Sequence, residues 1–491
     1  MASIARKARR QKSQSHRQRK NERRLRRRSK KNRPRPQRPA PLPGGLWRIV
    51  GALFAFFAGA FTRPTWQRFS VLLFAAILTT GSRTLSNLLR TVDRLAPGDP
   101  SSYHRVISKR CWSIWRLGRA LAGFIFKRWL PEGPIPLAGD DTVAEHKGKK
   151  VFGKGCHRDA VRSTHSFTAF RWGHKWVVLA VLVKFPFATR PWALPLLCAL
   201  YRTEKDNQAC GRRHKTPAEL MRQLLIVLLR WYPERRFVFV GDGGYGTHPL
   251  ASFAHRQRQR LTLVSRFYAD ANLYALPAQR QTKKAKGRPR QKGRKLAKPE
   301  AVVRRTRRQR LRVAWYGGGQ RDIEVVTRTG HWYKAGAGLV PVRWVYVHDC
   351  TGTHRDEYFF STDVELSAKE IVEGYTRRWN IETTFQEMRT WLKFEKTRGW
   401  TEKTVLRTAP CLFGLYAVIA VIYAELPAKW QAERAMVAAK KTSVTFSDAI
   451  TALRRWLWSE WIFAAPRHDR AFAKIPPRLR AALLTSLAPS A

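Results

Sequence analysis

Hydrophobic and polar positions divide the 491-residue chain into a helical first part and a mixed α/β remainder. Residues 46–130 favour helices, among them two uncharged apolar runs, Ala52–Phe61 and Phe69–Gly81. Each run falls short of the roughly 18–20 residues that a membrane span requires. We therefore interpret both runs as buried helices, and we expect no membrane association.

From about residue 131 the pattern predicts strands that alternate with helices. Apolar runs typical of strands occupy residues 135–142, 176–185, 192–201, 237–240 and 261–264, and an apolar helix is expected at 217–230. Further strand-like runs at 311–316, 321–327, 342–348 and 357–361 follow a basic stretch at 279–312. We interpret residues 268–362 as a β-rich insertion into an α/β core, because so long a charged loop is unusual inside a compact domain. One long helix is expected from Ala368 to Lys393.

These boundaries predict four regions: a disordered basic tail at 1–45, a helical DNA-binding domain at 46–130, a catalytic domain at 131–430 and a helical region at 431–491. Two amphipathic segments, 84–90 and 101–105, are separated by a polar turn and suggest a helix-turn-helix-like reader in which Arg105 reaches DNA. Many helical bundles share this spacing.

Charge indicates the partner. Lys and Arg number 95 against 33 Asp and Glu, for a formal net charge of +62. Such a balance is typical of proteins that bind a polyanion, with nucleic acid the first candidate. Within the basic stretch, Lys286-Gly287-Arg288-Pro289-Arg290 resembles a minor-groove hook, although a solvated basic loop fits as well. The six scattered cysteines argue against a disulfide framework and favour a reducing, cytoplasmic setting.

Acidic residues at strand ends indicate the chemistry. Asp141 and Asp242 each follow a short apolar run, and turn-forming or small residues come next. Open α/β sheets build their sites at such positions. With Glu382 from the long helix, they form an all-oxygen donor set that suits Mg²⁺. Two such ions can activate an attacking oxygen and stabilise a leaving oxygen in phosphodiester chemistry. Asp140 is the alternative to Asp141.

The helix that carries Glu382 also places Tyr375, Arg378 and Arg389 on one face, within an arc of about 60°. An intrahelical salt bridge would explain Arg378 and Glu382, but not the other two side chains. We expect Tyr375, Arg378 and Arg389 to contact DNA beside the carboxylates.

The motif Tyr375-x2-Arg378-x3-Glu382-x6-Arg389 resembles the Tyr-Arg-Glu-Lys signature of one large branch of DDE transposases from bacterial insertion sequences, with Arg389 in place of Lys. Asp141-Thr142 and Asp242-Gly243-Gly244-Tyr245-Gly246 are similar to the settings of that family's two aspartates. The resemblance implies a ribonuclease-H-like core with a β-rich insertion between the second Asp and the Glu. It also implies catalytic, metal-binding roles for Asp141, Asp242 and Glu382.

The resulting hypothesis is a bacterial, nucleoid-associated DNA transposase that cuts the ends of its element and joins them to target DNA. It would use two Mg²⁺ ions, with Mn²⁺ as a substitute, and act as a homodimer on DNA. One alternative is a ribonuclease-H-like nuclease without strand transfer. Another is a nucleic-acid-binding protein without catalysis.

Overall fold

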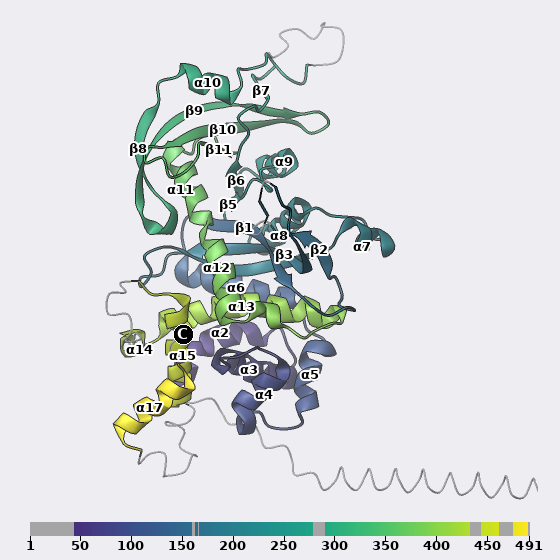
Figure 1. Ribbon diagram of the computed structural model, residues 1–491, viewed down its shortest axis with the longest axis vertical. Coiled ribbons are helices and arrows are strands. Elements are labelled where there is room, and N and C mark those ends of the chain that lie inside the picture. Colours follow the sequence, from purple (N-terminus) through teal and green to yellow (C-terminus); the bar gives the residue numbers. More distant parts are fainter. Residues whose placement is uncertain are drawn as a thin grey trace, which may run out of the picture.

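A mixed β-sheet lies at the centre of the computed structural model, which describes residues 44–159, 163–164, 166–277, 290–432, 443–460 and 475–489. Nearly all of the expected basic tail, and Arg288 of the hook-like motif, lie outside the described residues. Figure 1 shows helices packed below the sheet and a second group of strands above it.

The core of the sheet consists of β1 (Ile135–Glu145), β3 (Phe170–Val183), β4 (Trp192–Tyr201), β5 (Phe237–Gly241) and β6 (Leu261–Arg266). These strands are ordered β4-β3-β1-β5-β6. The β4-β3-β1 part is antiparallel, whereas β5 is parallel to both β1 and β6. Three antiparallel strands followed by two parallel ones form the ribonuclease-H-like mixed sheet, so the predicted fold class is confirmed.

Helices cover both faces of this sheet. On one face, α8 (Pro217–Trp231) packs so closely on β1 that a Cβ atom at Gly139 would collide with Met221 and Phe239. On the other face, α12 (Asn380–Trp391) contacts β1 and β4. The Thr384 hydroxyl of α12 donates to the carbonyl oxygen of Ala193 at 2.9 Å. The sheet is therefore a buried layer, which explains why β3 and β4 are continuous apolar runs.

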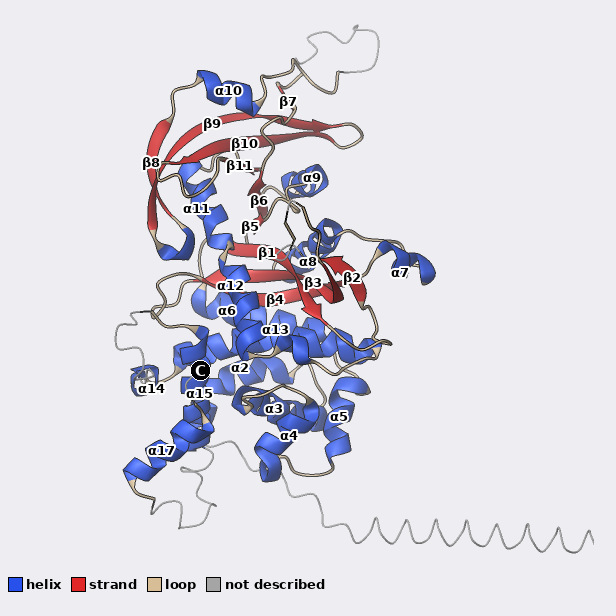
Figure 2. Ribbon diagram, in the orientation of Figure 1, coloured by secondary structure: helices blue, strands red, loops and turns tan. Residues whose placement is uncertain are grey.

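The insertion extends the same sheet. It contains β7 (Leu273–Tyr274), α10 (Pro299–Arg305), β8 (Gln309–Ala314), β9 (Gln320–Lys334), β10 (Gly338–Asp349) and β11 (Glu357–Ser361). Because β11 pairs with β6, the insertion strands continue the core sheet to 11 strands in the described part of the chain. Figure 2 shows these strands curling away above the helices. The predicted β-rich insertion is confirmed in kind and position.

The first part of the chain is helical, as predicted: it forms α2 (Gly44–Ala58), α3 (Arg63–Leu78), α4 (Leu85–Val92), η1 (Asp93–Leu95), α5 (Pro100–Ser108) and α6 (Ile114–Trp129). Buried residues of these helices belong to one continuous hydrophobic cluster with the sheet and the C-terminal helices. The buried Arg83 reinforces the union, because it donates to the carbonyl oxygens of Ala76 in α3 and Trp391 in α12, both at 2.8 Å. Residues 46–130 therefore share a core with the rest of the chain.

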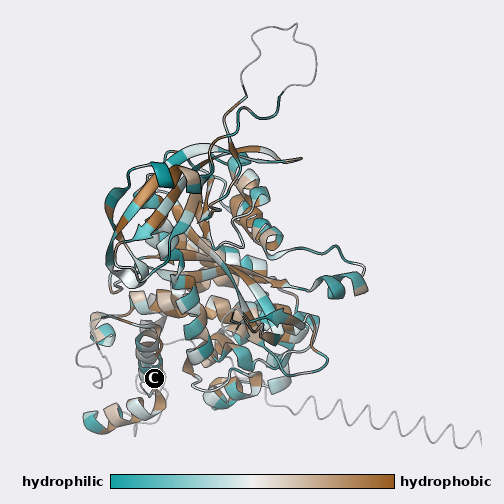
Figure 3. Ribbon diagram, turned by 45° about the horizontal axis from the view of Figure 1, so that its top comes forward, coloured by the Kyte–Doolittle hydropathy of each residue, from teal (hydrophilic) through white to brown (hydrophobic). Residues whose placement is uncertain are grey.

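The longest helix, α13 (Glu402–Glu425), packs against β4 and against the N-terminal helices, of which α6 also contacts β4 directly. Among the described residues it is the one helix long and apolar enough to cross a membrane, but 72% of its most apolar window is buried inside the protein. Its hydrophobicity on all sides is typical of a core helix. Figure 3 shows hydrophobic residues concentrated in this packed middle of the molecule.

The remaining elements are short or peripheral. They are β2 (Gly155–Arg158), α7 (Glu204–Ala209), α9 (His248–Arg256), η2 (Tyr316–Gly318), η3 (Phe394–Lys396), α14 (Ala428–Ala432), α15 (Phe446–Trp458) and α17 (Pro477–Leu487). The last three make the described part of the C-terminal region helical, as predicted.

Two sequence predictions are corrected. The single helix expected at 368–393 is two helices, α11 (Ala368–Arg378) and α12, which meet at Trp379. The side-chain amide of Asn380 donates to the Arg377 carbonyl oxygen at 2.8 Å, and Arg190 holds Asn380 from β4's side at 2.7 Å. In addition, β1 does not end at its aspartates but continues to Glu145.

Candidate active site

Two adjacent aspartates of β1 project in different directions, because successive side chains of a strand alternate between its faces. Asp140 and Thr142 are two residues apart and therefore point to the same face of the sheet. Asp140 contacts Arg378, the last residue of α11, and Thr142 contacts Arg389 of α12. Asp141 shares a parity with Gly139, whose open side meets α8. It pairs with Lys175 of β3, with 3.0 Å between Oδ1 and Nζ.

Asp242 follows β5 directly and lies beside these aspartates, because Gly241 is in register with Gly139 of β1. Its carbonyl oxygen accepts a hydrogen bond from the Ser265 hydroxyl at 2.7 Å. Its side chain accepts one from the backbone N–H of Gly244 at 3.0 Å. The turn after β5 thus fixes both ends of Asp242 directly beyond the last residue of β5.

Glu382 approaches the same aspartates from the first turn of α12. The preceding helix, α11, begins with a capping box in which Ser367 and Glu370 satisfy each other's backbone N–H groups. Arg378, at the end of α11, lies between the acids. Its Nη1 donates to Asp140 Oδ2 at 2.8 Å, and its Nη2 donates to Glu382 Oε1 at 2.9 Å. The guanidinium therefore joins β1 to α12 across the site.

Burial and mutual repulsion raise the pKa values of the acids in this cluster, because both disfavour the charged carboxylates. Burial raises the pKa of Asp140 to about 7; Arg378 opposes the shift, whereas Asp242, Glu382 and Asp141 add to it. Burial likewise raises the pKa of Asp141 against the effect of Lys175, and that of Glu382 against the effect of Arg378. Burial disfavours the charge on Arg378, but the neighbouring acids outweigh it and raise its pKa. The carboxylates of this centre outnumber the one guanidinium of Arg378, so it does not balance their formal charges.

This donor set suits a hard divalent cation, since every donor is a carboxylate oxygen. In the described part of the chain, no three His, Cys, Asp or Glu side chains already converge closely enough to hold a metal ion. The reason at this site is Arg378, whose guanidinium stands between Asp140 and Glu382 in place of a cation. The residues therefore fit a divalent ion in chemistry, and Arg378 marks the position that positive charge occupies.

The residues predicted to share the face of Glu382 have different surroundings. Tyr375 is only 1% exposed and stacks on Phe359 with 4.2 Å between ring centroids. The Arg378 side chain is 6% exposed. Both are therefore enclosed in this structure, which corrects the expectation of a stripe open to DNA.

Arg389 and Arg105 are more accessible. Arg389 is partly exposed, bonds to the hydroxyl of Thr142 and pairs with Glu395 at 3.2 Å. It therefore lies next to β1, one residue beyond Asp141. Arg105 is exposed on α5, within the helical first part of the chain.

Sequence reasoning missed two basic neighbours of the acids. Lys175 neutralises Asp141, and Arg266 of β6 lies near Tyr375 with 5.9 Å from its guanidinium carbon to the ring centroid. Arg266 also opposes the rise that burial causes in the pKa of Glu382. The available signal was positional: each is a cation in a mostly apolar strand, Lys175 in β3 beside β1 and Arg266 in β6 beside β5.

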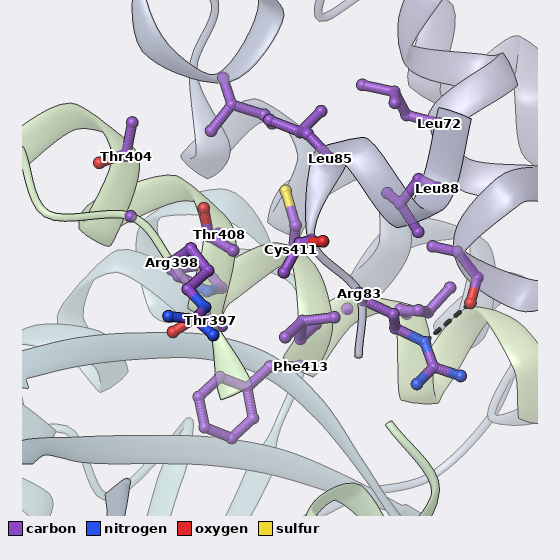
Figure 4. Close-up of a pocket in the computed structure, with 18 of the residues that line it drawn as sticks. Leu72, Arg83, Leu85, Leu88, Thr397, Arg398, Thr404, Thr408, Cys411 and Phe413 are labelled. Carbon is purple, nitrogen blue, oxygen red and sulfur yellow. Dashed lines mark hydrogen bonds between the residues drawn. The ribbon is translucent and has the colours of Figure 1, made fainter. Parts of the chain in front are cut away.

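A cavity of about 1290 Å³ lies elsewhere, between the N-terminal helices and α13. Figure 4 shows Leu72, Leu85 and Leu88 on one side of it and Cys411 and Phe413 of α13 on the other. None of the four site acids is among the described residues that line it. The acidic centre lies instead where β5 ends, beside the middle of β1.

A ribonuclease-H-like sheet with carboxylates on its central strand β1, directly after β5 and on α12 defines the class, a nuclease core of the ribonuclease-H type. The family model for DDE superfamily endonucleases matches residues 56–322, a little over half of the chain, and the chain belongs to that family. The matched region contains Asp140, Asp141 and Asp242, and it ends before Glu382. Endonucleases of this superfamily generally use divalent metal ions.

Comparisons with curated sequences and with solved structures do not add an activity. No curated protein sequence matches this chain. A solved structure, the cryo-EM synaptic complex of piggyBac transposase with hairpin DNA, aligns over 91% of this chain and 87% of its own, with 11% sequence identity and a TM-score of 0.37. That likeness is too distant to assign an activity.

Proposed function

We propose that this endonuclease is a DNA transposase that cuts the ends of its element and joins them to target DNA. The observation that carries the proposal is the meeting of Asp140, Asp242 and Glu382 where β5 ends, with Arg378 between Asp140 and Glu382. Membership of the DDE superfamily supports the nuclease part, and the signature-like spacing around Glu382 supports the transposase part.

We propose that Asp140, Asp242 and Glu382 are the metal-binding acids. This choice prefers Asp140 to Asp141, which the sequence favoured. Asp140 is joined to Glu382 through Arg378, whereas Asp141 pairs with Lys175. The charge of Asp242 acts on both aspartates. Two Mg²⁺ ions, with Mn²⁺ as a substitute, would activate the attacking oxygen and stabilise the leaving oxygen of the phosphodiester.

The chain's own residues would orient the reaction. Asp242 is fixed by the turn after β5, so it presents a constant position to bound substrate. Arg389, beside Thr142, would hold the DNA backbone next to the carboxylates. The excess of 95 basic over 33 acidic residues supports DNA as the partner, bound along the helical first part and Arg105. We further propose that a homodimer brings two ends together.

The decisive experiment compares two isosteric substitutions at adjacent positions. Asp140→Asn and Asp141→Asn each remove one charge from β1 and differ only in which face loses it. With end DNA from the borders of the coding region and Mg²⁺, Asp140→Asn should lower single-turnover cleavage by about three orders of magnitude, since several kcal/mol of metal-derived stabilisation is lost. Asp141→Asn should cut within about tenfold of the unaltered protein.

The reverse ranking would restore Asp141 as the ligand, and normal cleavage by both variants would remove β1 from the chemistry. Glu382→Gln serves as the reference for a complete loss. DNA binding by all three variants, measured by filter retention, should remain close to normal. A target plasmid in the same reactions tests joining: cleavage without joined products would favour a nuclease that lacks strand transfer.

A further inference from the structure

A β-hairpin beyond the acidic centre exposes large aromatic side chains. It consists of β2 and the start of β3, where Cys156 is paired with Trp172 and Arg158 with Phe170. Phe170 is 66% and Trp172 59% exposed. Side chains of one parity share a face of a strand, so these four residues form a single outward surface, hereafter the hairpin face. Exposure of two such aromatics on one small surface is unusual for side chains without a partner.

Trp172 is held in place, not merely left in solvent. The ammonium group of Lys154 lies 5.5 Å from the Trp172 ring centroid. Lys154 also donates to the carbonyl oxygen of Gly148 at 2.7 Å, which anchors it to the loop between β1 and β2. The backbone of Trp172 accepts a hydrogen bond from His146 at 3.0 Å. One face of the indole is thus occupied by a cation, and a fixed ring with an open surface remains.

Basic side chains dominate the segment that leads into the hairpin face, although Glu145 lies just before it, in register with Gly173. Residues 146–158 contain Lys147, Lys149, Lys150, Lys154 and Arg158 but no Asp or Glu. The three lysines of the loop and Arg158 are exposed. Asp159, the next acid along the chain, is buried and pairs with Arg171 at 3.2 Å on the opposite parity. Basic side chains interleaved with open aromatic rings are the combination that binds single-stranded nucleic acid.

The hairpin face lies beyond the carboxylates in the direction in which β1 runs. His146, opposite Trp172, is six residues beyond Asp140 in the same extended direction. At about 3.3 Å per residue this separation is about 20 Å, or about six base steps of DNA. Bases inside a duplex cover one another, so a ring on the hairpin face can stack on an unpaired base but not on a base inside a duplex.

We propose that the hairpin face, comprising Cys156, Arg158, Phe170 and Trp172, binds unpaired nucleotides of the DNA strand whose phosphate lies at the acidic centre. Phe170 and Trp172 stack on bases, while Arg158 and the loop lysines neutralise phosphates. This assignment rests on the proposed function for the identity of the DNA, but its recognition chemistry is independent of cleavage.

Cys156 provides a test that needs no substitution. It is an exposed thiol directly across from Trp172, while Cys111, Cys210 and Cys350 are exposed thiols elsewhere in the chain. The full-length protein is treated with N-ethylmaleimide, with and without an oligothymidylate of about twenty nucleotides, and each cysteine is followed by mass spectrometry. Alkylation of Cys156 should slow at least about fivefold with this oligonucleotide, and by less with a blunt duplex at equal occupancy.

A matched set of variants measures the stacking. Trp172→Ala and Phe170→Ala should each lower affinity for the oligothymidylate by about five- to hundredfold, as loss of one base-stacking ring typically does. Tyr268→Ala removes another exposed aromatic, from the segment after β6, and should leave the affinity within about twofold. Circular dichroism should be unchanged for all three, because the rings are on the surface.

Three results would overturn the inference. Cys156 could react at the same rate with and without the oligonucleotide, or the duplex could protect it as well as the single strand. Alternatively, Trp172→Ala could leave DNA affinity intact while changing the mass of the free protein in light scattering, which would make the hairpin face a contact between protein copies. Protection of Cys156 in a protein that never cleaves DNA would sustain the inference while refuting the proposed function.

Discussion

Replacement of Arg378 by Ala tests the acidic centre most directly, because it removes the one side chain that bridges Asp140 and Glu382. The lost interactions are two charge-assisted hydrogen bonds, at 2.8 and 2.9 Å, from a side chain that is only 6% exposed. Removal of one partner from a buried ion pair typically costs about 3–5 kcal/mol. We expect that loss in the free energy of unfolding at pH 8 without divalent ions.

The loss should depend on pH, and this dependence separates the explanation from a generic packing defect. At pH 5.5 a proton can neutralise Asp140, whose pKa is already about 7 with Arg378 present. Only the bond to Glu382 is then missed, so the destabilisation should fall to about half or less. Mg²⁺ should restore more stability to the variant than to the unaltered protein, since a bound ion supplies the missing charge.

Urea unfolding at the two pH values, each with and without Mg²⁺, provides the measurement. Arg389→Ala is the matched control, because Arg389 also pairs with an acid near β1 but is 36% exposed and should cost about 1 kcal/mol or less. Equal losses for both variants at both pH values would refute the placement of Arg378 between the carboxylates.

Two further predictions concern other buried charges. The pKa of Asp140 is raised from 3.8 to about 7. Its contribution to the stability of the fold is therefore complete below about pH 4 and is lost as the pH rises through 7, a change of about 4 kcal/mol. Asp140→Asn should flatten the pH dependence of the thermal unfolding temperature over that range. Arg454 donates to the carbonyl oxygens of Ile77 and Thr79 at 2.8 and 2.9 Å, at the end of α3. Arg454→Ala should therefore destabilise the protein by about 3 kcal/mol in urea titrations, whereas Arg90→Ala, on exposed α4 surface, should change stability by about 0.5 kcal/mol or less.

The core strands could be predicted from the sequence because a strand that is buried on both sheet faces consists of an uninterrupted apolar run. The expected run at 192–201 coincides with β4, and the run at 237–240 lies within β5. The β-rich insertion was also predictable, since the basic stretch interrupts a regular alternation. In each case the signal is local, and a neighbouring element is not needed to interpret it.

The break between α11 and α12 could not be predicted in that way. Trp379 has helical backbone angles, φ −50° and ψ −23°, and neither Pro nor Gly marks the position. The break depends on Asn380, whose side chain bonds to Arg377 while Arg190 holds it from a distant part of the sequence. The periodicity of a helix contains no information about such a contact. It therefore predicted an open face for Tyr375, whereas the ring packs against Phe359.

The choice between Asp140 and Asp141 shows the same limit for a strand. Both follow an apolar run, so composition treats them alike, but a shift of one residue sends a side chain to the other face. Only the pairing of β1 with β3 and β5, and the position of Arg378, distinguishes them. Motif similarity favoured Asp141 because a motif depends on neighbours along the chain. The ion pairs instead show which residues are neighbours in space.

The opposite charges of the whole chain and of its acidic centre are compatible because they act over different distances. A formal net charge of +62 attracts DNA, yet it would also repel divalent cations if it acted unscreened. At physiological ionic strength the Debye length is about 8 Å, so the exposed lysines of the loop beside the hairpin face contribute little at the carboxylates. At the acidic centre, Asp140, Asp242 and Glu382 repel one another at close range and are only partly compensated by Arg378. A surface charge that suits a polyanion can therefore coexist in one chain with a cluster of carboxylates where β5 ends.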